Sequence, residues 1–320
     1  MIKIGITGAG SPNAGELIRI LINHPEADIR SLYEPELLGR APSSVHHGLL
    51  GESIVNFSDK LNPEELDIVF LTNQTPFSQN LIENKNNWPE LKLIDLTAND
   101  EKAMENGAFA IGVSEINRKN LVRTVTTAFI PSQVLVPALI ALFPLAQFML
   151  LNNPLEVSIA LPKDLLSEIK PLDELEKLLS RAITVAQPSF SSPIHLTLEE
   201  NSDENRVMVM KISFNCTLSI DEIEKIYEGI YDDHNFTFVT HTPVSVKEVE
   251  GNQKCIISLN KDAPSSLEIT AIVDGRMRGG AGDAVHIMNL LQGLYEKTGL
   301  QLKSSSFHSS DSPGTISWFA

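Results

Sequence analysis

The chain carries the stretch KIGITGAGSPNAGELIRIL at residues 3–21, where an apolar run, a glycine-rich turn and a helix-forming segment follow one another. The run Lys3–Thr7 is typical of a buried strand, and Leu17–Ile22 is apolar on a good helix-forming background. A strand, a glycine turn and a helix in this order place backbone N–H groups where a phosphate can bind. The stretch therefore predicts the first βα unit of a dinucleotide-type fold.

Short apolar runs separated by helix-length segments continue this pattern through the first 130 residues. They lie at Asp28–Tyr33, Asp67–Thr72, Leu91–Leu96 and Thr124–Phe129. Such alternation predicts βαβ units and a Rossmann-type, doubly wound parallel sheet.

The second half of the chain has a different pattern. Helical periodicity covers Leu172–Ala182 and Ser219–Tyr231, and a long helix is expected over Gly280–Glu296. Five strands are expected, at Glu156–Leu161, Val207–Asn215, Phe236–Thr240, Cys255–Leu259 and Leu267–Val273. This mixture predicts an α+β domain with a mainly antiparallel sheet. We expect residues 1–131 with 276–320 to form the nucleotide-binding domain, and 132–275 to form the second domain.

Composition narrows the class of partner. Twenty-five Lys and Arg against 41 Asp and Glu give a formal charge of −16. Such a surface repels phosphate backbones and anionic lipid, so we expect neither nucleic acid nor a membrane as partner. A small anion would need a local basic pocket. The apolar run Val134–Leu151 contains Pro137 and Pro144, which favours a buried helix over a membrane span.

The few cysteines and the spacing of the histidines argue against a disulfide-rich protein and against a metal site. Cys216 and Cys255 are too few for a disulfide framework or a cysteine-built zinc site. The histidines show no metal-ligand spacing, so we expect no metal. With no leader of the secretory type at the amino terminus, this pattern predicts a reducing, cytoplasmic location.

The glycine turn is the first candidate site. Gly8 and Gly10 fit a dinucleotide fingerprint, whereas Asn13 stands where a third glycine is expected. Glu34 follows the second strand, where a carboxylate accepts a hydrogen bond from a ribose 2′-hydroxyl and repels a 2′-phosphate. The candidate cofactor is NAD or NADP, with Glu34 favouring NAD. The alternatives are a ligand-free tight turn and a solvated acid. Five turn residues are candidates: Gly8, Gly10, Ser11, Pro12 and Asn13.

Several longer segments resemble the N-acetyl-gamma-glutamyl-phosphate reductases of the aspartate-semialdehyde dehydrogenase superfamily. They are GAGSPNAGELIRILINHPEADI at 8–29, VHHGL at 45–49, DIVFLT at 67–72, LIDLTAND at 93–100, IGVSEINR at 111–118, EVEGNQKC at 248–255 and DGRMRGGAGDAVHIMNLLQGLYEKTGL at 274–300. The resemblance covers most of the chain in order. It implies NAD or NADP binding, a homodimer formed through the second domain, and a cofactor contact at Gly279, where Arg278-Gly279 keeps the family's Lys-Gly character.

The resemblance also implies a reaction, in which a cysteine thiolate attacks an acyl phosphate and hydride transfer reduces the thioester. The family's NPGCYPT motif, aligned without gaps from Pro131 to Pro144-Leu145, places its cysteine on Gln133. No cysteine precedes Cys216. A carboxamide is not nucleophilic and cannot form the thioester. We expect Cys216 and Cys255, both in apolar strands, to be inert.

The family's other site motifs are only partly present in this sequence. The family's glycine-rich SGxSGAG substrate loop falls near Ser158–Leu166, which has no glycine. A stretch similar to TPHL-x-P-x-x-RG makes His195 the acid–base candidate and Arg206 the anion-binding candidate; a packed histidine and an arginine paired with an acid are the alternatives. The family's second glycine falls on Ser11, whose side chain is expected to crowd a pyrophosphate.

Three interpretations remain open at this level. In the first, the chain is a family member without the reductase chemistry that retains nucleotide or small-anion binding, or acts as a binding or regulatory protein. In the second, it is an active NAD(P)-dependent reductase with another nucleophile, or with non-covalent hydride transfer to a preformed aldehyde. In the third, it is a structural partner subunit of an active homologue.

Overall fold

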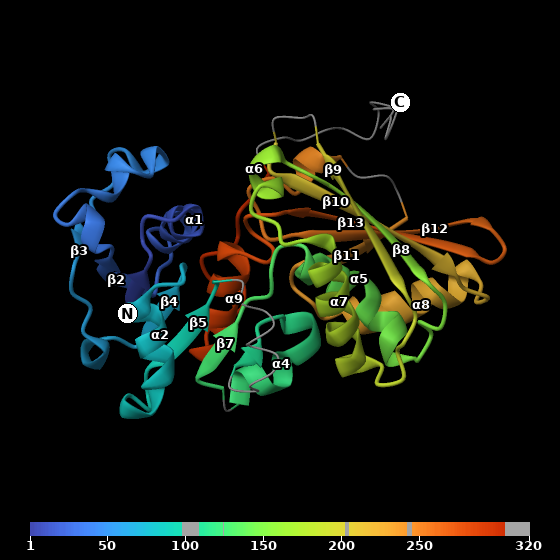
Figure 1. Cartoon of the computed structure of the whole chain (residues 1–320), viewed down its shortest axis with the longest axis horizontal. Helices are drawn as coiled ribbons and strands as arrows, with labels where there is room; N and C mark the ends of the chain where they lie inside the picture. The colour runs from blue at the N-terminus through green and yellow to red at the C-terminus, as the bar shows by residue number, and fades with distance from the viewer. Residues whose placement is uncertain (98–108, 124, 202–204, 242–244, 305–320) are drawn as a thin grey trace. The chain divides into compact units, whose positions relative to one another are not determined.

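A computed structural model describes residues 1–97, 109–123, 125–201, 205–241 and 245–304. Its contacts divide the chain into two compact units (Figure 1). The first comprises Met1–Ser132 with Gly279–Gln301, and the second comprises Gln133–Arg278 with the described residues that follow Gln301. No helix in the described ranges is long and apolar enough to cross a membrane.

The first unit is built on a seven-stranded parallel sheet in the order β3-β2-β1-β4-β5-β7-β6. The order reverses between β1 and β4, which is the switch point where α/β sheets bind ligands at their carboxyl ends. The strands are β1 (Ile2–Thr7), β2 (Ala27–Tyr33), β3 (Phe57–Ser58), β4 (Ile68–Leu71), β5 (Lys92–Asp95), β6 (Ala110–Ile111) and β7 (Thr127–Phe129). The strand predicted at Thr124–Phe129 is therefore shorter, and Thr124 lies outside the described residues.

Within the described residues, four α-helices accompany this sheet: α1 (Pro12–Leu21), α2 (Pro76–Glu83), α4 (Ser114–Arg123) and α9 (Ala281–Leu291). The chain returns late to supply α9, which packs against α1, α4 and β5. The helix predicted to reach Glu296 was too long, because α9 ends at Leu291. Gly293, with a φ of +68°, then adopts the left-handed conformation that glycine tolerates.

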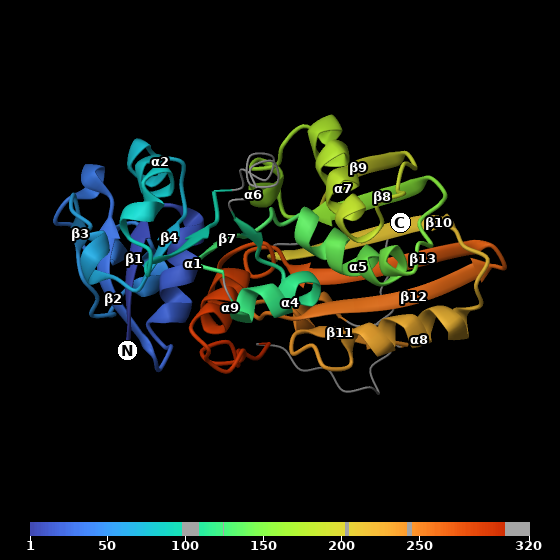
Figure 2. The same cartoon turned by 90° about the horizontal axis from the view of Figure 1, so that it is seen from below.

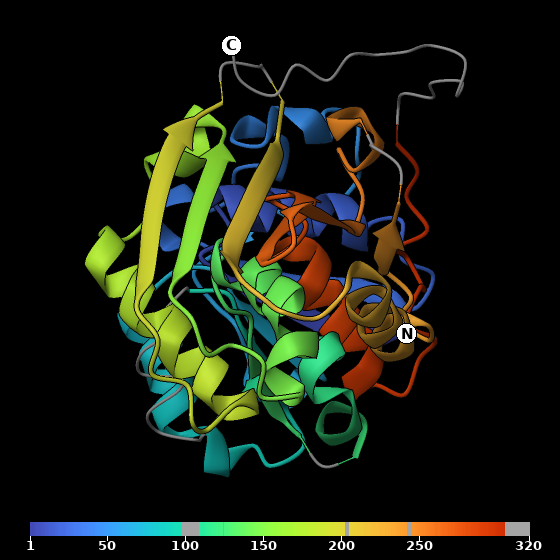
Figure 3. The same cartoon turned by 90° about the vertical axis from the view of Figure 1, so that its right-hand side faces the viewer.

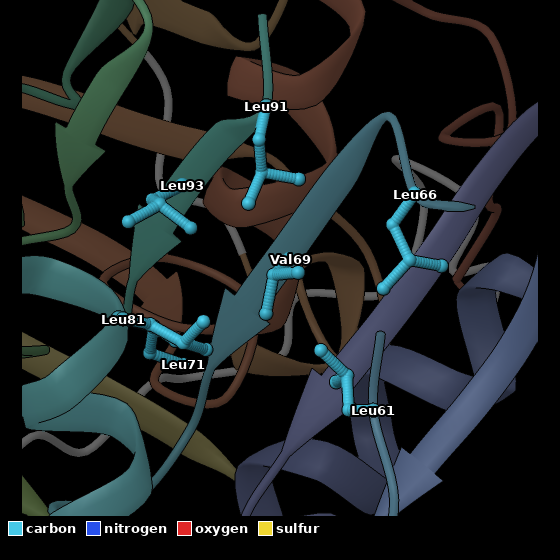
Figure 4. Packing of buried hydrophobic residues seen from close by; sticks show 7 residues of the cluster. All are labelled: Leu61, Leu66, Val69, Leu71, Leu81, Leu91 and Leu93. Carbon is cyan, nitrogen blue, oxygen red and sulfur yellow. The ribbon is translucent and has the colours of Figure 1, made fainter. Parts of the chain in front are cut away.

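One face of β4 and β5 carries a leucine-rich core (Figure 4). Leu61 and Leu66 cover the inner strand, and a Cβ on Gly5 would lie 2.6 Å from Leu66 Cδ1. Glycine in β1 thus lets these leucines approach the backbone. The buried cluster consists of Leu61, Leu66, Val69, Leu71, Leu81, Leu91 and Leu93.

The second unit contains a six-stranded mixed sheet in the order β11-β12-β13-β10-β8-β9 (Figure 3). Three of its five pairings are antiparallel, and β8–β9 and β11–β12 are parallel. The strands are β8 (Leu155–Leu161), β9 (Ile194–Glu200), β10 (Val207–Asn215), β11 (Thr237–Thr240), β12 (Cys255–Ala263) and β13 (Ser266–Asp274). All five predicted strands are present; β9 was missed.

In the described part of this unit the α-helices are α5 (Leu135–Gln147), α6 (Lys163–Leu166), α7 (Leu172–Ala186) and α8 (Ile220–Tyr231) (Figure 2). The capping box predicted at Ser219 and Glu222 is present at the start of α8. Helix α5 is buried against α7, α8 and β13, as its apolar sequence predicted. Pro144 cannot donate to the Ile140 carbonyl, and the hydroxyl of Tyr231 donates to that carbonyl instead.

Candidate functional site

The turn between β1 and α1 is shaped by one glycine and one cap. Gly8 has a φ of +68°, and a Cβ there would lie 2.5 Å from Asn73 Cβ. Ser11 is the N-cap of α1; its Oγ accepts a hydrogen bond from the Ala14 N–H at 3.2 Å and donates to Thr72 Oγ1 at 2.9 Å. The Ser11 side chain therefore takes up an N–H donor and points toward the end of β4.

Thr72, which directly follows β4, ties this turn to the neighbouring strand. Its Oγ1 lies 2.8 Å from the carbonyl oxygens of both Thr7 and Gly8. With Ser11 donating to the same oxygen, the hydroxyls connect the carboxyl ends of β1 and β4 at the switch point. Thr72 was not predicted as a site residue, and in the sequence only its position directly after an apolar strand points to this role.

The backbone N–H groups of the turn are almost all engaged within the protein. Gly8 and Ala9 donate to the Tyr33 carbonyl, Gly10 to Glu34 Oε2, Ser11 to the Gly8 carbonyl and Ala14 to Ser11 Oγ. Pro12 has no N–H. Among the described residues, no acceptor is found for the N–H of Asn13. The turn thus offers a phosphate one backbone donor, where the helix amino ends of phosphate-binding turns offer several.

Glu34 follows β2 and reaches back to this turn. Its Oε2 accepts a hydrogen bond from the Gly10 N–H at 2.9 Å. A Cβ on Gly10 would lie 3.2 Å from both Glu34 Oε2 and Leu37 Cδ1, so a side chain there would press on the carboxylate. The other oxygen, Oε1, has no hydrogen-bond partner in the described part of the chain. The structure therefore brings the side chain of Glu34 to the backbone of Gly10, and the predicted contact of Glu34 with a ribose stays a prediction.

His46 supports the turn from the opposite side. Its Nε2 lies 2.8 Å from the Ala9 carbonyl oxygen, so this nitrogen carries the proton and donates it. A Cβ on Gly15 would lie 2.5 Å from His46 Nδ1. Gly15 therefore gives the imidazole room to rest on α1. His46 was noted in the sequence only as part of a loop motif.

Gly279 lies two residues before α9, next to the N-cap residue Gly280. Its φ is +70°, and its N–H donates to Asp283 Oδ2 at 2.7 Å. This N–H is thus committed to capping the helix. Across the residues that the structure covers, no group of three His, Cys, Asp or Glu side chains could hold a metal ion.

In the second unit, Gln133 lies in the turn before α5. Its side chain is half-buried and forms no hydrogen bond with another described residue. Val134 caps α5 without a side-chain hydrogen bond. The thiols lie elsewhere. Cys255 starts β12, as predicted, and is fully buried, whereas Cys216 lies just after the end of β10 rather than in a strand and is 6% exposed.

The structure does not bring His195 and Arg206 together. His195 is exposed on β9 and pairs with Glu156 near the start of β8. Glu156 pairs in turn with Ser213 of β10, whereas Arg206 precedes β10 by one residue. Arg206 and Ser213 are seven positions apart in the chain, which separates the two candidates by about 20 Å along the strands. They cannot act together on one small substrate.

Arg206 instead belongs to a cluster around the buried Asp274. Its Nη2 lies 3.4 Å from Asp274 Oδ1, and the same carboxylate accepts the N–H groups of Gly251 and Arg276 at 2.7 and 2.8 Å. The alternative of an arginine paired with an acid is thus the one observed. Asp274 holds the turn that follows β13.

No family model matches the chain. Individual relatives match it over almost its whole length. The N-acetyl-gamma-glutamyl-phosphate reductase of Parabacteroides distasonis is 31% identical, over 96% of this chain and 100% of the relative. The enzyme of that name from Flavobacterium johnsoniae is also 31% identical, over the same shares. The chain belongs to the N-acetyl-gamma-glutamyl-phosphate reductase family. The resemblance identified from the sequence motifs is confirmed.

Solved structures place this reductase-family chain in the same fold as semialdehyde dehydrogenases. The aspartate semialdehyde dehydrogenase II of Vibrio cholerae superposes with a TM-score of 0.67 at 14% identity, over 92% of this chain and 99% of that one. The Candida albicans enzyme, solved with NADP, superposes with a TM-score of 0.67 at 12% identity, over 91% and 98%. The predicted fold class, a Rossmann-type unit plus an α+β unit, is confirmed.

Within this reductase-family chain, the segment predicted to replace the glycine-rich substrate loop is regular and clamped. Ser158 lies inside β8, and the short helix α6 follows. Arg276 Nη1 and Nη2 lie 2.8 and 2.7 Å from the two oxygens of Glu168, and Nη2 lies 3.0 Å from Asp164 Oδ2. Burial of the guanidinium opposes its charge, but the bonds to Glu168 and Asp164 prevail and raise the pKa of Arg276.

Leu165 completes this clamped segment, which we define as Lys163–Glu168. It is 1% exposed, and a Cβ on Gly275 would lie 2.5 Å from Leu165 Cδ1. The leucine therefore packs directly on the backbone of the turn after β13. This packing fixes Leu165 against the turn, so the segment is anchored to the protein core rather than forming a flexible loop.

Proposed function

We propose that this protein retains the fold and nucleotide-binding turn of its family but has lost the thioester-forming reduction. The observation that carries the proposal is Gln133, which the gapless alignment puts at the position of the family's nucleophile. The amide nitrogen of glutamine shares its lone pair with the carbonyl and cannot attack an acyl phosphate.

Neither thiol can substitute for the missing nucleophile. Cys255 is fully buried and pairs with Val273 in the sheet, and Cys216 is 6% exposed. A reactive cysteine needs access to substrate and a neighbourhood that stabilises its thiolate. Buried thiols of this kind are chemically inert packing groups.

The clamped segment Lys163–Glu168 supports the same conclusion independently. Its backbone N–H groups are turned to local helical bonds, since Leu166 donates to Pro162 and Ser167 to Lys163. The substrate loop implied by the family motif depends on glycine for close backbone approach. Here the segment contains none and is held by Arg276.

The retained activity is binding of a nucleotide or small anion in the first unit. Glu34 Oε1 fits a ribose hydroxyl, and the Asn13 N–H fits one phosphate oxygen. The residues thus offer the ribose of a dinucleotide the acceptor it needs, but offer the pyrophosphate only one backbone donor among the described residues. When bound, NAD or NADP would supply a hydride acceptor or donor. Because the chain carries a charge of −16, we expect binding to weaken with each phosphate added.

An active reductase is the second candidate function. It is favoured by full-length relatives at 31% identity that carry that name. It would require a nucleophile other than a cysteine, or hydride transfer to a preformed aldehyde.

The two functions separate in the reverse reaction. The protein is incubated with N-acetyl-glutamate semialdehyde, phosphate and NAD or NADP, and formation of the reduced cofactor is followed together with acyl adducts by mass spectrometry. We expect no phosphate-dependent turnover and no adduct, with Gln133→Ala behaving as the wild type. Phosphate-dependent turnover or an acylated side chain in the wild type would refute the loss of chemistry. Gln133→Cys tests whether a thiol alone restores acylation.

We also propose that the protein forms a homodimer through its second sheet. One face of this sheet is covered by α5, α7 and α8, while alternate residues of β8 on the other face are partly or fully exposed. A partly exposed face of a mixed sheet, such as this one, is suited to pairing with a second copy. Size-exclusion chromatography with light scattering measures the molar mass of the protein in solution. A monomer at micromolar concentration would contradict the proposal.

A further inference from the structure

Glu34 is poised to select among dinucleotides. We infer that the turn of the first unit takes a nucleotide with a free ribose 2′-hydroxyl, of the NAD type, and rejects the 2′-phosphorylated NADP type. The inference rests on the proposed nucleotide binding and adds its specificity. It depends on three features: how the carboxylate is held, which oxygen is free, and which charges surround it.

Hydrogen bonds fix both the backbone and the side chain of Glu34. The Glu34 N–H donates to the Ser58 carbonyl at 2.9 Å, and the Leu37 N–H donates to the Glu34 carbonyl at 3.0 Å. At the side chain, Oε2 accepts the Gly10 N–H at 2.9 Å. Glu34 is therefore fixed in place before any ligand binds, and preorganised polar groups bind with little ordering cost.

The second oxygen is the selective one. With Oε2 bound to Gly10, Oε1 keeps its lone pairs for a donor. A ribose 2′-hydroxyl can donate to it, whereas a 2′-phosphate has no comparable donor and carries like charge. Two anions at hydrogen-bond distance repel each other strongly in a half-buried site.

The surrounding charges do not offset this repulsion. No Lys or Arg in the described ranges forms an ion pair with Glu34. Arg40, six residues further along, is exposed and forms no ion pair with a described residue. A 2′-phosphate would therefore meet the carboxylate without an intervening cation.

The test measures the affinities of NADH and NADPH separately, by ligand fluorescence and calorimetry, at fixed ionic strength. We expect the wild type to bind NADH at least about tenfold more tightly than NADPH. Glu34→Gln keeps an acceptor for the Gly10 N–H but removes the charge, and should raise the NADPH affinity about tenfold. Glu34→Ser should reverse the preference. Circular dichroism and melting temperature check that each variant is folded.

Two matched controls sharpen the result. Glu36→Gln removes an exposed acid two residues away and should leave the NADH to NADPH ratio unchanged. Arg40→Ala should also leave the ratio unchanged; a selective loss of NADPH binding would show that Arg40 receives the phosphate and would overturn the inference.

The failures of the two proposals are distinguishable. Equal or tighter NADPH binding by the wild type overturns the specificity but leaves nucleotide binding standing. If neither dinucleotide binds to the wild type or to any variant, both the specificity and the nucleotide-binding part of the proposed function fall.

Discussion

The glycine turn of the first unit and the clamped segment of the second lie where the family's motifs place a nucleotide-binding turn and a substrate loop, and they keep those motifs to different degrees. The turn keeps its left-handed Gly8, its helix cap and its carboxylate partner Glu34. The clamped segment Lys163–Glu168 has become a packed piece of structure, held by Arg276. A turn that also joins β1 to α1 must persist for the fold to form. A substrate loop has no such second task, so it can be rebuilt.

The largest expected effect comes from breaking the turn. Gly8→Ala adds a Cβ 2.5 Å from Asn73 Cβ in a left-handed conformation. Backbone strain and overpacking together should lower the free energy of unfolding by about 2–5 kcal/mol. The measurement is urea unfolding followed by circular dichroism. Gly39→Ala, at a φ of +77° with nothing within 4 Å, is the control and should show the backbone cost alone, about 1–2 kcal/mol. Equal effects would mean that the contact with Asn73 is unimportant.

Loosening the clamped segment comes next. Arg276→Ala removes a largely buried guanidinium from Glu168 and Asp164, whose side chains are 38% and 64% exposed. Because the partners regain water, the expected loss is about 1–2 kcal/mol, with faster hydrogen exchange over residues 163–168. Lys177→Ala breaks the ion pair with Asp173 and should cost less than about 0.5 kcal/mol. Unchanged exchange in the Arg276 variant would show that the arginine does not hold the segment.

The cap of α1 provides a smaller effect that sharpens the comparison. Ser11→Ala removes the acceptor for the Ala14 N–H and should cost about 1 kcal/mol. It also frees that N–H for a phosphate oxygen, so affinity for ADP should rise while stability falls. Ser219→Ala removes the corresponding cap of α8 and should cost the same without changing ADP affinity. Weaker ADP binding by the Ser11 variant would contradict the idea that Ser11 keeps the Ala14 N–H from a phosphate.

The smallest effect depends on pH. Burial raises the pKa of Asp95 at the end of β5, and hydrogen bonds from Thr97 offset this only in part. The folded state therefore holds the proton more tightly than the unfolded chain. The full cost of ionisation is present above the folded pKa, falls as pH drops through that pKa, and vanishes only below the pKa of the unfolded chain. Asp95→Asn should be more stable than the wild type at neutral pH, with a difference that shrinks toward pH 4. Thermal unfolding from pH 4 to 8 measures this.

The control for that pH series is Asp59→Asn, an exposed acid for which the curves of variant and wild type should run parallel. A stability difference between Asp95→Asn and wild type that persists unchanged to pH 4 would show that packing, not ionisation, is responsible.

Local patterns predicted the elements well and their assembly less well. The β1 turn and the five strands of the second unit follow from alternation and apolar runs. Strand β9 was missed because its sequence was interpreted as a catalytic motif. His195 and Arg206 are 11 residues apart in the chain, yet the register of β8, β9 and β10 puts them at opposite ends of the sheet. Register depends on cross-strand packing, which no local window contains.

From the sequence alone followed the fold class, the family and the presence of a carboxamide at residue 133. These follow from periodicity and residue chemistry, which are local properties. Tertiary structure alone decided that Gly10 binds Glu34, that Ser11 turns toward Thr72, and that Arg276 clamps a segment more than a hundred residues away. Each of these contacts joins distant parts of the chain, and only folding brings their atoms within hydrogen-bonding reach.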